Sequence, residues 1–128
     1  LEAEAPPVMP NDLASTTGST NFSKVAPSSL KLYHLLARKA KSKDFGSYKY
    51  RGEWGLLDHL IVSGTLLNQS NHFFTSEEKA NVCLLPFLLK DDEKYGDKEP
   101  FRTYKGMKYQ GGVSDHLPIY ADFELILY

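Results

Sequence analysis

The C-terminal stretch Ile119 to Leu127 alternates in hydropathy, and this restricts the possible folds more than any other segment. A period of two is typical of a β-strand that packs one face on a core. The predicted apolar face consists of Ile119, Ala121, Phe123, Leu125 and Leu127, and the opposite face of Tyr120, Asp122 and Glu124. The chain must therefore contain a sheet with at least one apolar face.

A second strand is predicted from Leu56 to Ser63, where nearly every residue is apolar. Such a continuous run favours a strand that is buried on both faces. Asp58 interrupts the run, and strand geometry puts it on the face of Leu56 and Leu60, with His59 pointing the other way. A buried carboxylate is costly unless it is paired, so Asp58 must find a partner elsewhere in the fold.

One helix is predicted from about Leu30 to Lys41, because Ser28 or Ser29 can cap it and its apolar residues recur at helical spacing. Its apolar face consists of Leu32, Leu35, Leu36 and Ala40. A helix followed by several strands predicts an α+β fold with one main helix on a mainly antiparallel or mixed sheet. Residues 1–29 predict a mobile loop or linker with a short helical start at Leu1 to Ala5, and residues 30–128 form the domain.

Composition narrows the classes of partner. The net charge is -1 and the pI is about 6.5, so no overall positive field recruits nucleic acid. A phosphate-bearing substrate would have to be held locally or by a metal. No apolar run reaches membrane-spanning length, and no targeting segment is recognised, which leaves the compartment open. Cys83 is the only cysteine and is expected to be a buried small hydrophobe rather than a reactive thiol.

The candidate chemistry lies in two Asp-His pairs, Asp58-His59 and Asp115-His116. The second pair follows two glycines, which let the backbone come close to another group or take unusual dihedral angles. The pair then enters the last strand, and loop residues at strand ends are common places for catalytic groups. His116 can transfer a proton near neutral pH, and a carboxylate on its ring would orient it. Asp58 is the predicted partner of His116, and Asp115 is a further carboxylate. The alternative is ordinary turn chemistry, because Ser-Asp is common in turns.

Two motifs resemble a known superfamily. Residues 112–119 read Gly-Val-Ser-Asp-His-Leu-Pro-Ile, which resembles the Ser-Asp-His-Leu-Pro signature of the endonuclease/exonuclease/phosphatase superfamily. Residues 57–63 read Leu-Asp-His-Leu-Ile-Val-Ser and resemble its Ile-Asp-Tyr-Ile-Phe-Val-Ser strand. The resemblance covers Tyr48 to Leu127 and implies a phosphate-ester substrate. Nucleic acid, phospholipid, inositol phosphate and sugar phosphate all occur in the superfamily.

The resemblance also implies roles for single residues. His116 matches the histidine that contacts the scissile phosphate, and Asp58 matches the aspartate that orients it. Asp115 matches an aspartate at or near the metal site, which holds Mg or Mn in the intact enzyme. His59 departs from the usual Tyr, and Trp54 resembles an aromatic that packs before the strand.

The superfamily also needs an Asn, a Glu and a Gly-Asp-Phe-Asn-like motif upstream, and the sequence contains no such motif. We therefore expect the C-terminal half of a four-layer α/β/β/α sandwich, inactive alone and without an ordered metal. The parent would hydrolyse a phosphate ester by in-line attack of water. The alternative is a non-catalytic interaction or ligand-binding domain on the same scaffold. The open sheet face would be covered by the missing N-terminal half or by a second copy of the chain.

Overall fold

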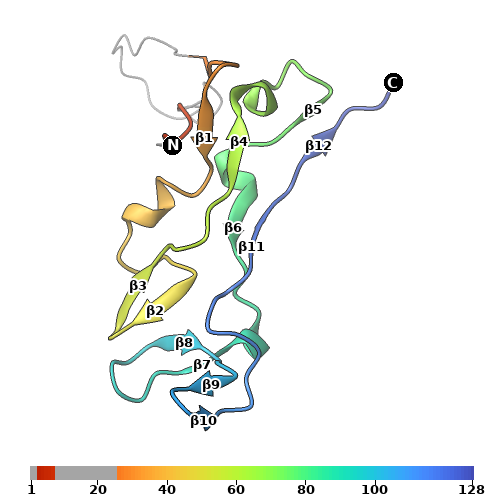
Figure 1. Cartoon of the computed structure of the whole chain (residues 1–128). Helices are drawn as coiled ribbons and strands as arrows, with labels where there is room; N and C mark the ends of the chain where they lie inside the picture. Colours follow the sequence, from red (N-terminus) through yellow and green to blue (C-terminus); the bar gives the residue numbers. More distant parts are fainter. Residues whose placement is uncertain (1–2, 8–25) are drawn as a thin grey trace, which may run out of the picture.

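The computed structural model describes residues 3–7 and 26–128 (Figure 1), and within them all regular structure is short strands and 3-10 helices. The strands are β1 Leu32–His34, β2 Tyr48–Tyr50, β3 Glu53–Gly55, β4 Ile61–Ser63, β5 Phe73–Phe74, β6 Ala80–Val82, β7 Leu89–Asp91, β8 Lys98–Pro100, β9 Tyr104–Lys105, β10 Lys108–Tyr109, β11 Ile119–Ala121 and β12 Glu124–Leu125. The 3-10 helices are η2 Lys39–Lys41, η3 Gly64–Leu67, η4 Glu77–Lys79 and η5 Pro86–Leu88.

The strands form antiparallel pairs of two kinds. The pairs β1–β4, β6–β11 and β5–β12 join segments that are far apart in the chain, and we call them the long-range region. The pairs β2–β3, β7–β8 and β9–β10 are hairpins of neighbouring strands, and we call them the hairpin region. In Figure 1 the long-range region occupies the upper and middle part of the molecule, and the hairpin region the lower part.

The core consists of two apolar clusters that share partly buried side chains. The first cluster is built on Tyr33, Leu35, Leu36, Leu67 and Ala80, and the second on Val82, Leu88 and Leu117. Phe45, Leu56 and Ile119 pack against both clusters and join them into one core. This core lies beneath the segments that carry Asp58 and His116.

The predicted helix from Leu30 to Lys41 is wrong. Leu32–His34 is a strand that pairs with Ile61–Ser63, and the amide of His34 donates to the carbonyl of Glu4 at 2.7 Å. Helical hydrogen bonding appears only locally, from the Ala40 amide to the Leu36 carbonyl at 2.9 Å. Pairing with distant strands overrides local helical spacing here. The main helix and the four-layer sandwich are therefore not seen in the described part of the chain.

The second predicted strand is correct in its faces but wrong in its length and burial. Only Ile61–Ser63 is assigned as strand, and the side chains alternate between half-buried and exposed from Leu56 onward. Leu57 is 59% exposed and Ile61 is 44% exposed, so the strand is not buried on both faces. Asp58 does share the inner face with Leu56 and Leu60, as predicted.

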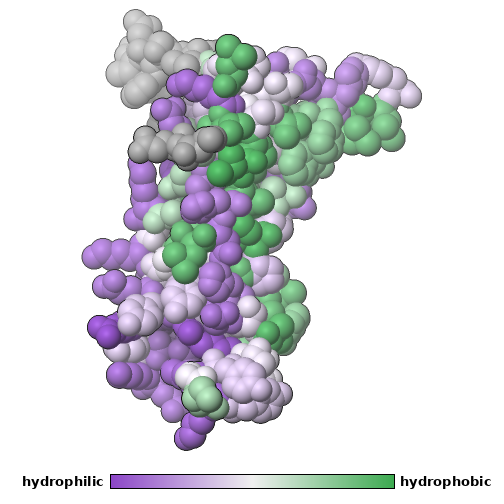
Figure 2. All heavy atoms as spheres, viewed as in Figure 1, coloured by the Kyte–Doolittle hydropathy of each residue, from purple (hydrophilic) through white to green (hydrophobic). Residues whose placement is uncertain are grey.

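The alternating C-terminal stretch forms two short strands, β11 and β12, rather than one. Ile119 and Ala121 pack against the core, but the chain beyond Ala121 is exposed. Exposed apolar atoms cover much of the long-range region in Figure 2, whereas the hairpin region is mostly polar. The large exposed apolar side chains of this region and its connections include Leu57, Ile61, Phe73, Leu84, Leu85, Phe87, Leu125 and Leu127, which we call the apolar surface.

The N-terminal prediction can be followed only in part. Glu4 forms an isolated parallel bridge with Tyr33, so the short helical start is wrong where the structure describes it. Residues 8–25 lie outside the described residues, and the domain boundary at residue 29 stays a prediction. Across residues 3–7 and 26–128, no helix has the length and apolarity required to cross a bilayer.

Candidate active site

Asp58 and His116 come together at the junction of the two regions. Asp58 Oδ2 lies 2.7 Å from His116 Nδ1, which is a short charge-assisted hydrogen bond or ion pair. Asp58 precedes β4 and His116 precedes β11, and both side chains are 36% exposed. The predicted contact between these side chains is confirmed, although their strands belong to different two-stranded sheets rather than to one sheet edge.

Ser47 contacts the same Asp58 oxygen as His116, and sequence reasoning missed it. Its Oγ donates to Asp58 Oδ2 at 2.5 Å, and the residue is fully buried. Its amide donates to the Gly55 carbonyl at 3.1 Å, and its carbonyl accepts from the Leu117 amide at 2.7 Å. Ser47 therefore links the hairpin β2–β3, the Asp58 segment and the His116 segment. Only the preceding Gly46, whose backbone approaches Gly55, marks the position in the sequence.

The electrostatics keep Asp58 charged. Burial by itself raises the pKa of Asp58, but the hydrogen bonds from Ser47 and His116 lower it by more, so the pKa lies below the usual value. An ionised carboxylate only accepts hydrogen bonds, so His116 Nδ1 must carry a proton. This fixes the imidazole orientation and leaves Nε2 as the nitrogen that can meet a substrate.

Aromatic and glycine residues fix the surroundings of His116. The Tyr48 ring lies 5.1 Å from the His116 ring at an angle of 45°. Gly111 has a φ of +81°, and a Cβ on Gly112 would meet the Phe101 carbonyl oxygen at 2.0 Å. The close backbone approach predicted for these glycines is confirmed, and it sets the path of the loop that ends at His116.

Asp115 is placed apart from this pair. It is exposed and lines a surface hollow of about 310 Å³ together with Thr103, Tyr104, Val113 and Ser114. Nowhere in residues 3–7 and 26–128 do three or more His, Cys, Asp or Glu side chains gather as metal ligands would. Magnesium requires near-octahedral oxygen coordination, so this single carboxylate does not by itself fit a complete magnesium site.

The other residues singled out by the sequence lie outside the pair. His59 is exposed, and its ring packs 4.7 Å from His34 rather than near His116. Trp54 packs against the second core cluster, which agrees with a packing role. Cys83 is half-buried and also packs against that cluster.

Comparison with known proteins gives one match. The sequence model of the endonuclease/exonuclease/phosphatase family matches residues 9–125. The match extends well upstream of Tyr48, where the motif resemblance was expected to begin, so the N-terminal stretch also carries family character. No curated protein and no solved structure matches the chain.

Proposed function

The chain belongs to the endonuclease/exonuclease/phosphatase family, a family of nuclease- and phosphatase-type hydrolases, and we propose that its parent enzyme hydrolyses a phosphate ester with His116 at the reaction centre. The observation that carries this proposal is the 2.7 Å contact between Asp58 and His116, buttressed by buried Ser47. Two segments that are 58 positions apart in the sequence come together to hold one imidazole. A solvated turn would not need that arrangement.

In the proposed reaction, water attacks the phosphorus in line with the leaving oxygen. Asp58 holds the Nδ1 proton of His116, so that Nε2 faces the phosphate. His116 then contacts a phosphate oxygen. It acts as the general acid or base in the proton transfer and stabilises the negative charge that develops on the phosphate. Ser47 acts as a positioning residue, because it fixes the carboxylate rather than touching the substrate.

A divalent cation, Mg²⁺ or Mn²⁺, is part of the proposal for the complete enzyme, where it would stabilise negative charge on the phosphate. Asp115 would supply one carboxylate. Because this donor does not make a complete site, the remaining ligands would have to come from outside the described residues. The steps above therefore rest on His116 and Asp58 alone.

We further propose that the chain is the C-terminal part of the catalytic domain and is inactive by itself. The apolar surface supports this, because large apolar side chains that gather in exposed positions usually mark an interface. The covering partner would be the N-terminal half of the domain or a second copy of this chain. Light scattering of the purified chain distinguishes these two, since only the second gives a dimer without any added protein.

The alternative function is a non-catalytic interaction or ligand-binding domain on the same scaffold. Two observations favour it: the sequence lacks a Gly-Asp-Phe-Asn-like motif, and the described residues gather no set of metal ligands. In that case the Asp58–His116 pair would be a structural hydrogen bond. The two functions differ in whether His116 is needed for turnover.

The test is hydrolysis of bis(p-nitrophenyl) phosphate with Mg²⁺ or Mn²⁺ by the complete gene product that contains this chain. His116→Ala should lower kcat by about 10²–10⁴-fold, the usual contribution of a general acid or base. His72→Ala is the control, because His72 is exposed and its ring contacts only Tyr128 among the described residues. An equal rate for wild type and His116→Ala would contradict the catalytic role. Turnover by the isolated chain, lost in His116→Ala, would instead contradict its being an inactive part.

A further inference from the structure

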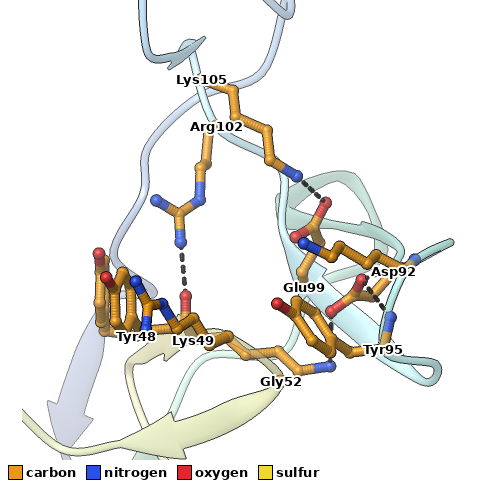
Figure 3. Close-up of a pocket in the computed structure, with 11 residues that line it drawn as sticks. Tyr48, Lys49, Gly52, Asp92, Tyr95, Glu99, Arg102 and Lys105 are labelled. Atoms are coloured by element: carbon orange, nitrogen blue, oxygen red, sulfur yellow. Dashed lines mark hydrogen bonds and ion pairs between the residues drawn. The ribbon is translucent and has the colours of Figure 1, made fainter.

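The hairpin region contains a pocket that the sequence reasoning did not identify. Figure 3 shows it between the β2–β3 hairpin, the β7–β8 hairpin and the start of β9, with a volume of about 290 Å³. Its lining includes five cations and only two acids, in a chain whose net charge is -1. The cations are Lys49, Arg51, Lys94, Arg102 and Lys105, and the acids are Asp92 and Glu99.

Both acids are already paired. The Lys49 ammonium lies 3.0 Å from Asp92 Oδ2, and both side chains are buried. Lys105 lies 3.6 Å from Glu99 Oε1, and Lys90 lies 3.4 Å from the same oxygen. No further carboxylate lines the pocket, so the remaining cations there are not neutralised by it.

Those remaining cations are Arg51, Lys94 and Arg102, and none of them forms an ion pair with a described residue. Each lies instead over a tyrosine ring, at 5.1 Å for Arg51 and 5.0 Å for Lys94 and Arg102. Tyrosine faces hold a cation without cancelling its charge. The pocket therefore keeps an excess of positive charge.

Arg102 carries an unsatisfied donor. Its Nη2 donates to the Lys49 carbonyl at 2.6 Å, but its Nε is buried and has no hydrogen-bond partner. Buried polar groups without partners are rare, and they are costly unless a ligand or water satisfies them. An anion oxygen that reached Nε would remove this cost, and one that accepts from the other N–H groups of the guanidinium would gain a charge-assisted hydrogen bond.

The tip of the β2–β3 hairpin shows a second irregularity. Arg51 has a φ of 51° and Gly52 a φ of 86°, so both central residues of the turn are left-handed. Such turns strongly prefer Asn-Gly, and an arginine at the first position is strained. The turn therefore carries a cation where another residue would be more stable, on the rim of the basic pocket.

The pocket adjoins the Asp58–His116 pair. Tyr48 lines the pocket, and its ring contacts His116 at 5.1 Å while Arg102 lies over the same ring at 5.0 Å. One molecule could therefore reach His116 with one group and the pocket with another.

We propose that this pocket is a second phosphate site, which holds a phosphate group of the substrate other than the one at His116. The inference rests on the proposed function, and it narrows the substrate to molecules that carry at least two phosphate groups. Arg51, Lys94 and the guanidinium of Arg102 are its ligands. The second phosphate comes from a small phosphorylated molecule or from a nucleic-acid strand, and both present the same oxygens to these cations.

The test is titration of the isolated chain with inorganic pyrophosphate, followed by the backbone amide shifts of Arg51, Gly52 and Lys94 in NMR spectra. Arg51→Asn removes a charge and places a preferred residue in the turn, so it should raise the unfolding midpoint while it weakens binding. Together with Lys94→Gln it should weaken binding by about tenfold or more. Lys108→Gln removes an exposed lysine outside the pocket and should change the affinity by less than about twofold.

Two further arms make the outcome decisive. In one arm, binding is followed at the pocket amides and not by turnover, so the pocket can be confirmed even if the protein hydrolyses nothing. A 5′-phosphorylated dinucleotide that binds at the same amides more tightly than pyrophosphate would assign the phosphate to a nucleic-acid strand, and weaker binding would assign it to a small molecule. The proposal is overturned if those amides show no saturable shift. It is also overturned if Lys108→Gln weakens binding as much as the pocket variants do.

Discussion

The long-range region and the hairpin region are held together by different interactions. In the long-range region, fully buried leucines such as Leu35 and Leu36 pack beneath strands that meet across long stretches of chain. In the hairpin region, the most buried side chains include charged residues, with Lys49 and Asp92 paired at 3.0 Å. Apolar burial is non-directional, whereas a buried ion pair demands a defined geometry.

The candidate active site depends on both regions. Ser47 and Tyr48 come from the hairpin side, while Asp58 and His116 lead into the strands of the long-range region. A change in either region can therefore move the Asp58–His116 contact. Variants placed in one region at a time separate what each region contributes.

Core truncation should have the largest effect, well above that of truncating an exposed side chain of the hairpin region. Leu36 is fully buried, so Leu36→Ala should lower the free energy of unfolding by about 3 kcal/mol through lost contacts and a cavity. Tyr109 in the hairpin region is 69% exposed, and Tyr109→Ala should cost less than about 1 kcal/mol. Urea denaturation of both variants measures the difference. Equal losses would contradict the burial of Leu36 in the core.

The glycine next to the His116 loop should be less replaceable than a glycine at a hairpin tip. A Cβ on Gly112 would overlap the Phe101 backbone, so Gly112→Ala should cost more than about 2 kcal/mol and displace the loop. Gly106 has a φ of +60° and open space around it, so Gly106→Ala should cost only about 1 kcal/mol. Thermal melts rank the destabilisation of the two variants. If Gly112→Ala is less destabilising than Gly106→Ala, the loop is not packed tightly against Phe101.

Acid should loosen the long-range region before the hairpin region. Burial, and next the charge of neighbouring His59, hold the pKa of His34 below its usual 6.5. As the pH falls, His34 is therefore protonated in the unfolded chain before it is protonated in the folded chain. The stability that neutral His34 contributes is present above pH 6.5 and is lost as the pH falls below that value.

In the hairpin region, burial raises the pKa of Asp92, but hydrogen bonds from the Tyr95 amide and from Lys49 lower it to below its usual 3.8. That contribution is lost only below pH 3.8, as the pH falls through the folded pKa. Hydrogen exchange, corrected for intrinsic rates, should thus show protection falling in β1 and β4 as the pH drops below 6.5, while β7 and β8 stay protected above pH 3.8. Loss of protection at the same pH in both regions would contradict this order. His34→Gln should abolish the loss of protection that begins below pH 6.5 in β1 and β4.

Several features of the site could be predicted from the sequence, because they follow from local geometry. The period of two placed Asp58 on the inner face, and the cost of burying a carboxylate required a partner such as His116. The paired glycines before the Ser-Asp-His motif indicated a close backbone approach, which the contact of Gly112 with Phe101 bears out.

The remaining features depend on long-range pairing that no local pattern encodes. Leu30 to Lys41 has helical spacing, yet Leu32–His34 forms a strand because Ile61–Ser63 and Glu4 supply its hydrogen-bond partners. Ser47 looks like any serine until the fold brings it beside Asp58. The basic pocket likewise gathers lysines and arginines from three separate hairpin segments, none of which is unusually basic alone.

The central claim is that this chain by itself preassembles the imidazole of His116 through Asp58. Long-range ¹⁵N–¹H NMR spectra at alkaline pH report which ring nitrogen of His116 carries the proton. We predict the proton on Nδ1, facing Asp58, and we predict that Asp58→Ala abolishes this preference while the signals of exposed His72 stay unchanged. A proton on Nε2 in the wild-type chain, or a His116 spectrum that Asp58→Ala leaves unaltered, would contradict the account.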